Sequence, residues 1–364
     1  MRASGTPLTR GAAALAACCV LLAVTACGGH SGPPAAPEAG QARVVARTPA
    51  DGGIGPEDSG ATRGVAVGAD GTVYVDTGER LVRLGEDGVY TDVSGRQSGR
   101  PARQDRGMSG LVLRGDGSML AGEDGQVVAI DPDDGQVTEL AGTAGTFRSL
   151  TDPVPRSAAA AGFRFTREVT PLAVEKDGTV VIADGTAVWA LSGGRLTQRY
   201  RQAAVKPAAD YMSPFVGQMS AAGPDGTAFL VPGNDTASLA DIVVVPGDGR
   251  APHKLAVPAR PAGTDVPTAD LAATYLASDG AGGVYANTFR RKGRGLYVVH
   301  VHDGRIDVAA SSTATATSDT CDVHKLVAAR GFPCYFPEGI AYRAGHVYLA
   351  GQRSYVLDIG VAAG

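Results

Sequence analysis

Two histidines offer the plainest metal chemistry in the sequence. His300 and His302 stand two residues apart in "VVHVHDG". On a β-strand this spacing puts both imidazoles on one face, as a zinc or copper pair would require. No third ligand accompanies them, and their strand is expected to be the third of its repeat, away from any central channel. We therefore favour two exposed histidines over a metal pair.

A pair of cysteines suggests a second kind of chemistry. Cys321 and Cys334 flank "DVHKLVAARGFP", and in an exported protein such a pair is expected to form a disulfide. A redox-active pair would have the closer C-x-x-C spacing. Closing this loop would contribute about 3 kcal/mol in the chain-entropy model.

The same loop carries the best candidates for recognition. His324 is the histidine to test first if the protein is an enzyme. Three aromatic residues lie within five positions, and they predict either a recognition surface or a cap over the apolar core. They are Phe332, Tyr335 and Phe336.

The start of the chain predicts export. Residues 1–26 begin with Arg2 and Arg10 and continue through "GAAALAACCVLLAVTA", an apolar stretch that is too short to span a bilayer and is typical of a signal peptide. "VTAC", which ends at Cys27, resembles the lipobox of bacterial lipoproteins and implies that Cys27 is lipidated. Residues 27–41 are rich in Gly, Pro and Ala and predict a flexible tether. We expect a lipid-anchored protein on the outer face of the bacterial cytoplasmic membrane, which it contacts through the anchor only.

Composition favours an all-β fold and excludes some partners. The chain has 51 Gly and 22 Pro, with Val and Thr runs between turn residues and no long amphipathic helical stretch. The net charge of -4 is spread along the chain, so we expect no nucleic-acid partner, because phosphate binding needs a concentrated basic surface. No nucleotide-binding loop or nucleophile elbow stands in a suitable context.

One pattern, an apolar strand, a tight Gly turn and a second apolar strand, recurs six times after the tether. The six copies are "RGVAVGADGTVYV", "SGLVLRGDGSMLA", "TPLAVEKDGTVVIA", "QMSAAGPDGTAFLV", "TYLASDGAGGVYA" and "EGIAYRAGHVYLA". A third and usually a fourth strand follow each copy, around turns whose central residues need positive φ. Together they predict antiparallel, four-stranded blades within residues 42–364. We place the blades near residues 64–95, 110–142, 171–202, 219–258, 275–311 and 339–361.

The sixth blade lacks an outer strand, and residues 42–48, "ARVVART", can supply it. The sequence therefore predicts a six-bladed β-propeller closed by an N-terminal strand, which removes the exposed edge between the first and last blades. A seventh blade would have to come from residues 146–168. They show no alternating apolar pattern, so we expect a long loop there.

"FPEGIAYRAGHVYLAG" and "RGVAVGADGTVYVDTG" resemble the repeat core of the NHL-repeat six-bladed β-propellers, and "LAGTAGTFRSLTDPVPRSAAAAGF" resembles a linker between such repeats. The resemblance covers nearly all of the mature chain and weakens in the fourth and fifth blades. It implies a scaffold whose function sits around the central channel and on the loop faces.

The residue before each inner strand is expected to face the channel mouth. These candidates form a mixed polar ring: Arg63, Ser109, Thr170, Gln218, Thr274 and Glu338. Glu338 in "PEGIAY" resembles a glutamate of the gluconolactonase group, whose six-bladed hydrolases gather several oxygen ligands around a cation. Calcium takes six to eight oxygens, and the ring holds one carboxylate. We therefore expect no cofactor and assign no catalytic residue, with calcium or zinc in the channel as the alternative.

Two functions follow from this ring. The first is a binding or scaffolding module for a protein, peptide or glycan, acting as a monomer. The alternative is a metal-dependent lactonase-like or lyase-like hydrolase with its site in the central channel.

Overall fold

In the computed structural model the chain forms two compact units, Met1–Pro34 and Ala35–Gly364. All described residues belong to the second unit. The structure describes residues 35–47, 64–76, 81–85, 90–93, 108–205, 212–233, 237–314, 325–350 and 355–362. The expectations for the signal peptide, Cys27, Arg63, Cys321 and His324 lie outside the described residues. Within the described part, no helix is long and apolar enough to cross a membrane.

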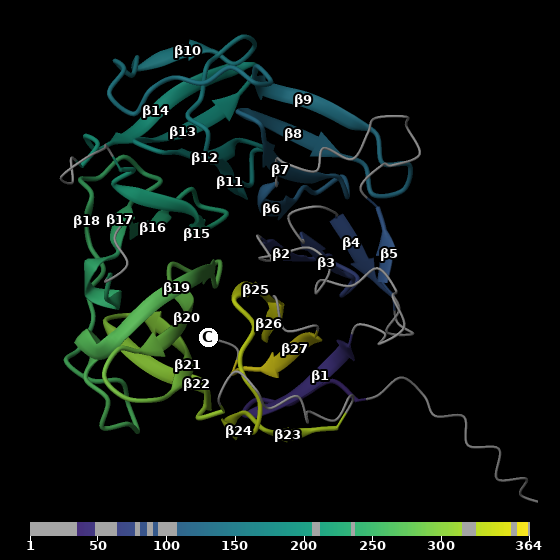
Figure 1. Cartoon of the computed structure of the whole chain (residues 1–364), viewed down its shortest axis with the longest axis vertical. Helices are drawn as coiled ribbons and strands as arrows, with labels where there is room; N and C mark the ends of the chain where they lie inside the picture. The colour runs from purple at the N-terminus through teal and green to yellow at the C-terminus, as the bar shows by residue number, and fades with distance from the viewer. Residues whose placement is uncertain are drawn as a thin grey trace, which may run out of the picture. The chain divides into compact units, whose positions relative to one another are not determined.

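Six sheets of mainly antiparallel strands surround a common centre in this unit (Figure 1), which confirms the six-bladed β-propeller. The described residues contain no α-helix and two short 3-10 turns, η3 (Leu239–Asp241) and η4 (Thr268–Asp270).

Blade 1 consists of β2 (Gly64–Val67), β3 (Val73–Asp76), β4 (Leu81–Leu84) and β5 (Tyr90–Asp92). Blade 2 consists of β6 (Ser109–Leu113), β7 (Met119–Glu123), β8 (Gln126–Ile130) and β9 (Val137–Gly142). Blade 3 consists of β11 (Val169–Val174), β12 (Val180–Asp184), β13 (Ala187–Ser192), β14 (Arg195–Arg201) and β10 (Ser157–Ala159).

The second half of the ring follows the same plan from the centre outward. Blade 4 consists of β15 (Phe215–Ala222), β16 (Ala228–Pro232), β17 (Val243–Val245) and β18 (His253–Lys254). Blade 5 consists of β19 (Leu271–Ser278), β20 (Val284–Arg290), β21 (Leu296–His302), β22 (Arg305–Ser312) and β24 (Arg330–Phe332). Blade 6 consists of β25 (Gly339–Arg343), β26 (His346–Ala350), β27 (Tyr355–Gly360), β1 (Gln41–Arg47) and β23 (Val327–Ala328). Blades 3, 5 and 6 thus have a fifth strand that the four-strand pattern did not predict.

The Asp-Gly turns explain why the hairpins form. In "GADGT", Gly71 adopts φ +85° and Asp70 Oδ1 accepts a hydrogen bond from Thr72 N at 3.0 Å, which is a three-residue loop with a bulge. Blades 2, 3 and 4 repeat the Asp side-chain bond and the positive-φ glycine. The turns from β7 to β8 and from β21 to β22 instead have positive φ at both central residues, Asp124-Gly125 and Asp303-Gly304. Both turn types need a glycine with positive φ, and the Asp-Gly pairs of the sequence mark where these turns form.

The apolar core lies between neighbouring blades. The inner strands β2, β6, β11, β15, β19 and β25 contact one another in that order around the ring, and β25 returns to β2. Between blades 2 and 3, Leu120 and Val127 pack against Phe165 and Trp189. A large cluster joins blades 5 and 6 and includes Tyr285 and Leu349. Each blade therefore depends on its neighbours for burial.

The ring closes through β1, as predicted. β1 pairs antiparallel with β27 in register Ala42 to Ile359, so the N-terminal segment supplies an outer strand of the last blade (Figure 1). Arg43 and Asp358 are paired in this register, and Arg43 Nη2 lies 3.3 Å from Asp358 Oδ2. His346 Nδ1 lies 2.8 Å from Asp358 Oδ1. Burial raises the pKa of Asp358, and the hydrogen bonds and charges of His346 and Arg43 oppose that rise.

The segment between blades 2 and 3 forms no blade of its own. A buried network around Asp184 anchors it, because Arg148 Nη2 lies 2.7 Å from Asp184 Oδ2. Asp184 also accepts hydrogen bonds from Thr166 N at 2.6 Å and from Trp189 Nε1 at 3.2 Å. Its short strand β10 pairs with β14. The prediction of a long loop is correct, although three of its residues extend blade 3.

We predict that Arg43→Ala lowers the free energy of unfolding by about 1 to 3 kcal/mol, because it removes the cation beside a buried carboxylate at the closure. Chemical denaturation would measure the change. Arg250→Ala is the matched control, since the Arg250–Asp248 pair has 80% and 56% exposed side chains and exposed pairs contribute little. Equal effects of the two substitutions would contradict a special role for the closure pair.

Candidate functional site

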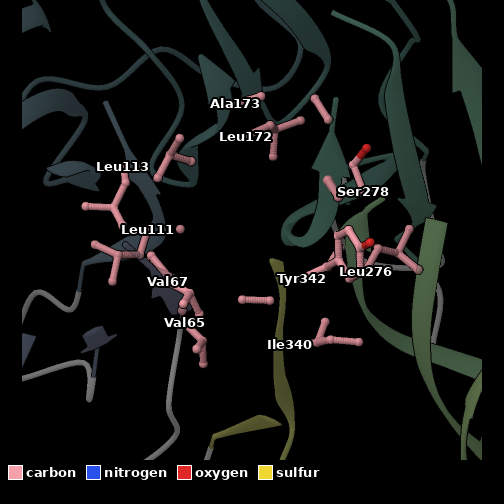
Figure 2. A pocket seen from close by; sticks show the side chains of 18 of the residues that line it. Val65, Val67, Leu111, Leu113, Leu172, Ala173, Leu276, Ser278, Ile340 and Tyr342 are labelled. Carbon is pink, nitrogen blue, oxygen red and sulfur yellow. The ribbon is translucent and has the colours of Figure 1, made fainter. Parts of the chain in front are cut away.

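The centre of the ring holds a cavity of about 480 Å³, here called the axial cavity. All six inner strands line it, and mainly aliphatic side chains surround it (Figure 2). They include Val65, Val67, Leu111, Leu113, Leu172, Leu276 and Ile340, together with Ser278 and Tyr342. These side chains offer van der Waals contact, and polar side chains also line the cavity, among them Gln218, Ser220 and Asp279.

Two of the predicted mouth residues join neighbouring blades. Ser109 Oγ in blade 2 donates a hydrogen bond to the Val169 carbonyl in blade 3 at 2.5 Å. Thr170 Oγ1 in turn donates to Ser109 Oγ at 3.3 Å, and Thr170 is buried. Gln218 is exposed and borders the axial cavity. The predicted ring is therefore not one uniform set of channel-facing groups.

A second cavity of about 300 Å³, here called the interblade pocket, lies among residues of blades 4, 5 and 6. Thr274 and Glu338, predicted at the mouth, line it together with Tyr335 and Phe336, predicted on the loop face. The other lining residues are Met219, Tyr275, Asn287, Thr288, Phe289 and Leu296. The fold thus brings Thr274 into one hollow with three predicted residues that lie close together much later in the chain.

The three loop aromatics differ in position. Phe332 and Phe336 are buried in the core between blades 5 and 6, with ring centroids 5.9 Å apart. Tyr335 is partly buried, and its carbonyl accepts a hydrogen bond from the Tyr355 hydroxyl. Phe332 therefore caps the core, whereas Tyr335 and Phe336 also line the interblade pocket. Cys334 between them is buried, and its pairing with Cys321 stays a prediction.

The polar groups of the interblade pocket are held in place. Asn287 is 4% exposed, and its Nδ2 donates hydrogen bonds to the Pro337 carbonyl at 2.7 Å and the Glu338 carbonyl at 3.1 Å. Thr274 Oγ1 donates to the Asn287 carbonyl at 2.9 Å. Sequence reasoning missed Asn287. Its signal was its place at the end of "VYAN", where blade 1 has Asp76 in "VYVD".

Glu338 is the single ionisable carboxyl group among the residues that line this pocket. It is partly buried, and its carboxylate has no ion pair or hydrogen-bond partner among the described residues. The lining contains no Lys, Arg or His. The interblade pocket is therefore apolar and aromatic, with one negative charge that the described lining leaves unneutralised.

The predicted histidine pair lies on β21 with both rings on one face, 4.3 Å apart and stacked. The expectation that both are exposed is wrong for His300, which is 8% exposed. His300 stacks on Tyr285 at 4.1 Å, and Tyr285 stacks on Tyr342 at 4.8 Å. This four-ring stack reaches the axial cavity at Tyr342 (Figure 2).

Asp279 fixes the buried end of the histidine pair. Its Oδ2 lies 2.8 Å from His300 Nε2, and its Oδ1 accepts hydrogen bonds from the N–H groups of Ala281 and Gly283 at 2.8 Å each. Burial works to raise the pKa of Asp279, but the hydrogen bonds from His300 and these N–H groups hold it below its ordinary value. Across the described ranges, no group of three or more His, Cys, Asp or Glu could hold a metal ion.

Comparison with known proteins identifies no family. No family model matches the chain, and no curated protein matches it. The solved structures that resemble it include a gluconolactonase from Xanthomonas campestris, with 15% identity, 91% of this chain and 98% of that chain covered, and a TM-score of 0.48. A regucalcin from Agrobacterium tumefaciens, described as a calcium-binding protein, has 14% identity, coverages of 90% and 95%, and a TM-score of 0.45. A chain of a nidogen/laminin complex has 10% identity, coverages of 83% and 90%, and a TM-score of 0.44.

We predict that Asp279→Asn destabilises the protein at pH 7 by about 1 to 3 kcal/mol, because it weakens a partly buried, charge-assisted hydrogen-bond network. The folded-state pKa of Asp279 lies below the ordinary 3.8, so its contribution is complete above that pH and is lost as the pH falls through the folded-state pKa. The gap to the wild type should therefore narrow in acid. Denaturation curves from pH 7 to pH 3 would show this, with the exposed Asp303→Asn as control. A gap that is constant with pH would contradict the assignment.

Proposed function

We propose that this protein is a binding or scaffolding propeller that takes a protein, peptide or glycan at the interblade pocket. The observation that carries the proposal is the meeting of Thr274, Glu338, Tyr335 and Phe336 around one concave site. Binding sites are commonly hollows with apolar and aromatic walls and a few placed polar groups. The interblade pocket has this make-up.

The walls of the pocket suit recognition because they are preorganised. Three polar side chains of the wall each donate a hydrogen bond to a backbone carbonyl: Asn287, Thr274 and Thr288. Because these side chains are already fixed, few of them would have to be ordered when a ligand enters. Phe289 is 39% exposed and lines the pocket. A partly exposed aromatic residue at the rim of a pocket is the kind of group on which binding energy concentrates.

The location of the protein is part of the same proposal. The resemblance of "VTAC" to a lipobox supports a lipid anchor at Cys27 on the outer face of the bacterial cytoplasmic membrane. The repeat motifs support membership of the NHL-repeat propellers. An exported protein would also permit the Cys321–Cys334 disulfide. Such an anchor would hold the propeller near the membrane surface while the pocket meets its partner.

A lactonase-like hydrolase is the second candidate, and the observation that favours it is the partly buried Glu338 carboxylate without a described partner. A hard cation prefers such oxygen ligands but takes several of them. The described residues do not fit a channel metal, because Asp279 is the single carboxylate among those that line the axial cavity, and the described part of the chain holds no group of three or more His, Cys, Asp or Glu that could bind one. We therefore derive no catalytic step through a metal.

We predict that Phe289→Ala weakens ligand binding about tenfold or more, because it removes an aromatic contact at the rim. Arrays of random octapeptides and of glycans would be probed with the wild type, and the retained ligands would be measured again with the variant. Leu326→Ala is the matched control, since Leu326 is 38% exposed and lies outside the pocket lining. Ligands that bind both variants as they bind the wild type would refute the pocket as the binding site.

We predict that the protein purified without chelators carries less than one tightly held metal ion per chain and does not hydrolyse simple lactones. Elemental analysis and a lactone hydrolysis assay would test this. Stoichiometric calcium or zinc, together with lactone hydrolysis that Glu338→Gln abolishes, would replace the binding proposal with the second candidate.

A further inference from the structure

We propose that the interblade pocket recognises a cationic side chain, arginine or lysine, presented by a peptide or protein partner. This inference rests on the proposed binding function and specifies its ligand. It is drawn from the charge, the aromatic content and the size of the pocket.

Charge gives the first argument. Glu338 is the single charged residue among the ten that line the pocket. Two of the polar neighbours, Asn287 and Thr274, direct their hydrogen bonds to backbone carbonyls and not to this carboxylate. A carboxylate that is partly withdrawn from water interacts more strongly with a cation than it does in bulk solvent. Guanidinium and ammonium groups would also form charge-assisted hydrogen bonds with it.

Aromatic content gives the second argument. Tyr275, Phe289, Tyr335 and Phe336 line the same small pocket as Glu338. Aromatic rings attract a cation that comes within about 6 Å of the ring centroid, and the attraction is larger when the cation is desolvated. The aliphatic stem of arginine or lysine would pack against the apolar part of the wall, which includes Met219 and Leu296. One side chain of this type would satisfy both features of the pocket.

Size and net charge agree with such a ligand. A volume of about 300 Å³ is at the lower end of the roughly 300 to 1,000 Å³ found for ligand pockets, so it suits one side chain better than a large ligand. The protein carries a net charge of -4, which weakly favours the approach of a basic partner. A neutral glycan could stack on the aromatic residues and donate hydroxyl hydrogen bonds to the carboxylate, but it would not neutralise the negative charge.

Methionine methyl NMR of the folded, full-length protein provides a local test. Met219 lines the pocket, whereas Met119 is fully buried in the core between blades 1 and 2 and serves as an internal control. The probes are the blocked tripeptides acetyl-Gly-Arg-Gly-amide and acetyl-Gly-citrulline-Gly-amide, which differ in charge and hardly in shape. We expect the arginine peptide to shift the Met219 methyl signal and leave Met119 unmoved.

The variants separate charge from shape. Glu338→Gln should weaken binding of the arginine peptide about tenfold or more, since it replaces a charge-assisted contact by a neutral one. Glu168→Gln is the matched control, because Glu168 directly precedes β11 as Glu338 precedes β25, and it is exposed and lines neither cavity. It should bind like the wild type.

Each other outcome has a definite meaning. If citrulline and arginine peptides shift Met219 equally, or if Glu338→Gln has no effect, the cation proposal is wrong while binding at the pocket stands. If neither peptide shifts the Met219 methyl signal but a glycan retained in the array screen does, the cation proposal is again wrong. The binding function then stands with a different ligand. If no peptide and no glycan moves Met219, both proposals fail.

Discussion

The pairing of β1 with β27 is the interaction on which the rest of the structure depends. A ring of sheets has a gap between its first and last blades unless one strand crosses it, and here β1 comes from the other end of the described chain. The cross-strand pair of Arg43 with the buried Asp358 fixes the register of that contact. Because the core lies between blades, closure is also what lets the last blade pack against the first, as Val356 does near Val75. The central cavity exists only as a product of this closure.

Much of the fold could be predicted because its causes are local. Asp-Gly turns such as Asp70-Gly71 set the hairpins, and short apolar runs between them form strands that are buried on both faces. The fifth strands β10, β23 and β24 escaped prediction because they are two or three residues long and arise from tertiary contacts with a neighbouring strand. The buried network around Asp184 depends in the same way on Arg148, which lies 36 residues earlier.

The candidate site was harder to predict than the fold. The inner strands β6, β11, β15 and β19 all contain irregularities in their pairing with the next strand, whereas β2 and β25 pair regularly. An inserted residue turns the side chains that follow to the other face, so equal sequence positions in different blades do not face the same way. Ser109 and Thr170 consequently bond between blades, while Thr274 and Glu338 meet at the interblade pocket. Asn287 was missed because its side chain donates hydrogen bonds to backbone carbonyls that lead into another blade, and no local sequence pattern marks such a contact.

The fifth strands bear on how the molecule behaves in concentrated solution. A sheet that ends in open N–H and C=O groups can recruit a strand from another molecule. In blades 3, 5 and 6, a short piece of loop lies along the strand that would otherwise be outermost. In blade 4 the outermost strand is two residues long and contains Lys254, which is exposed. The outer sheet edges of these four blades therefore offer little continuous backbone to a strand of a second molecule, which opposes edge-to-edge aggregation.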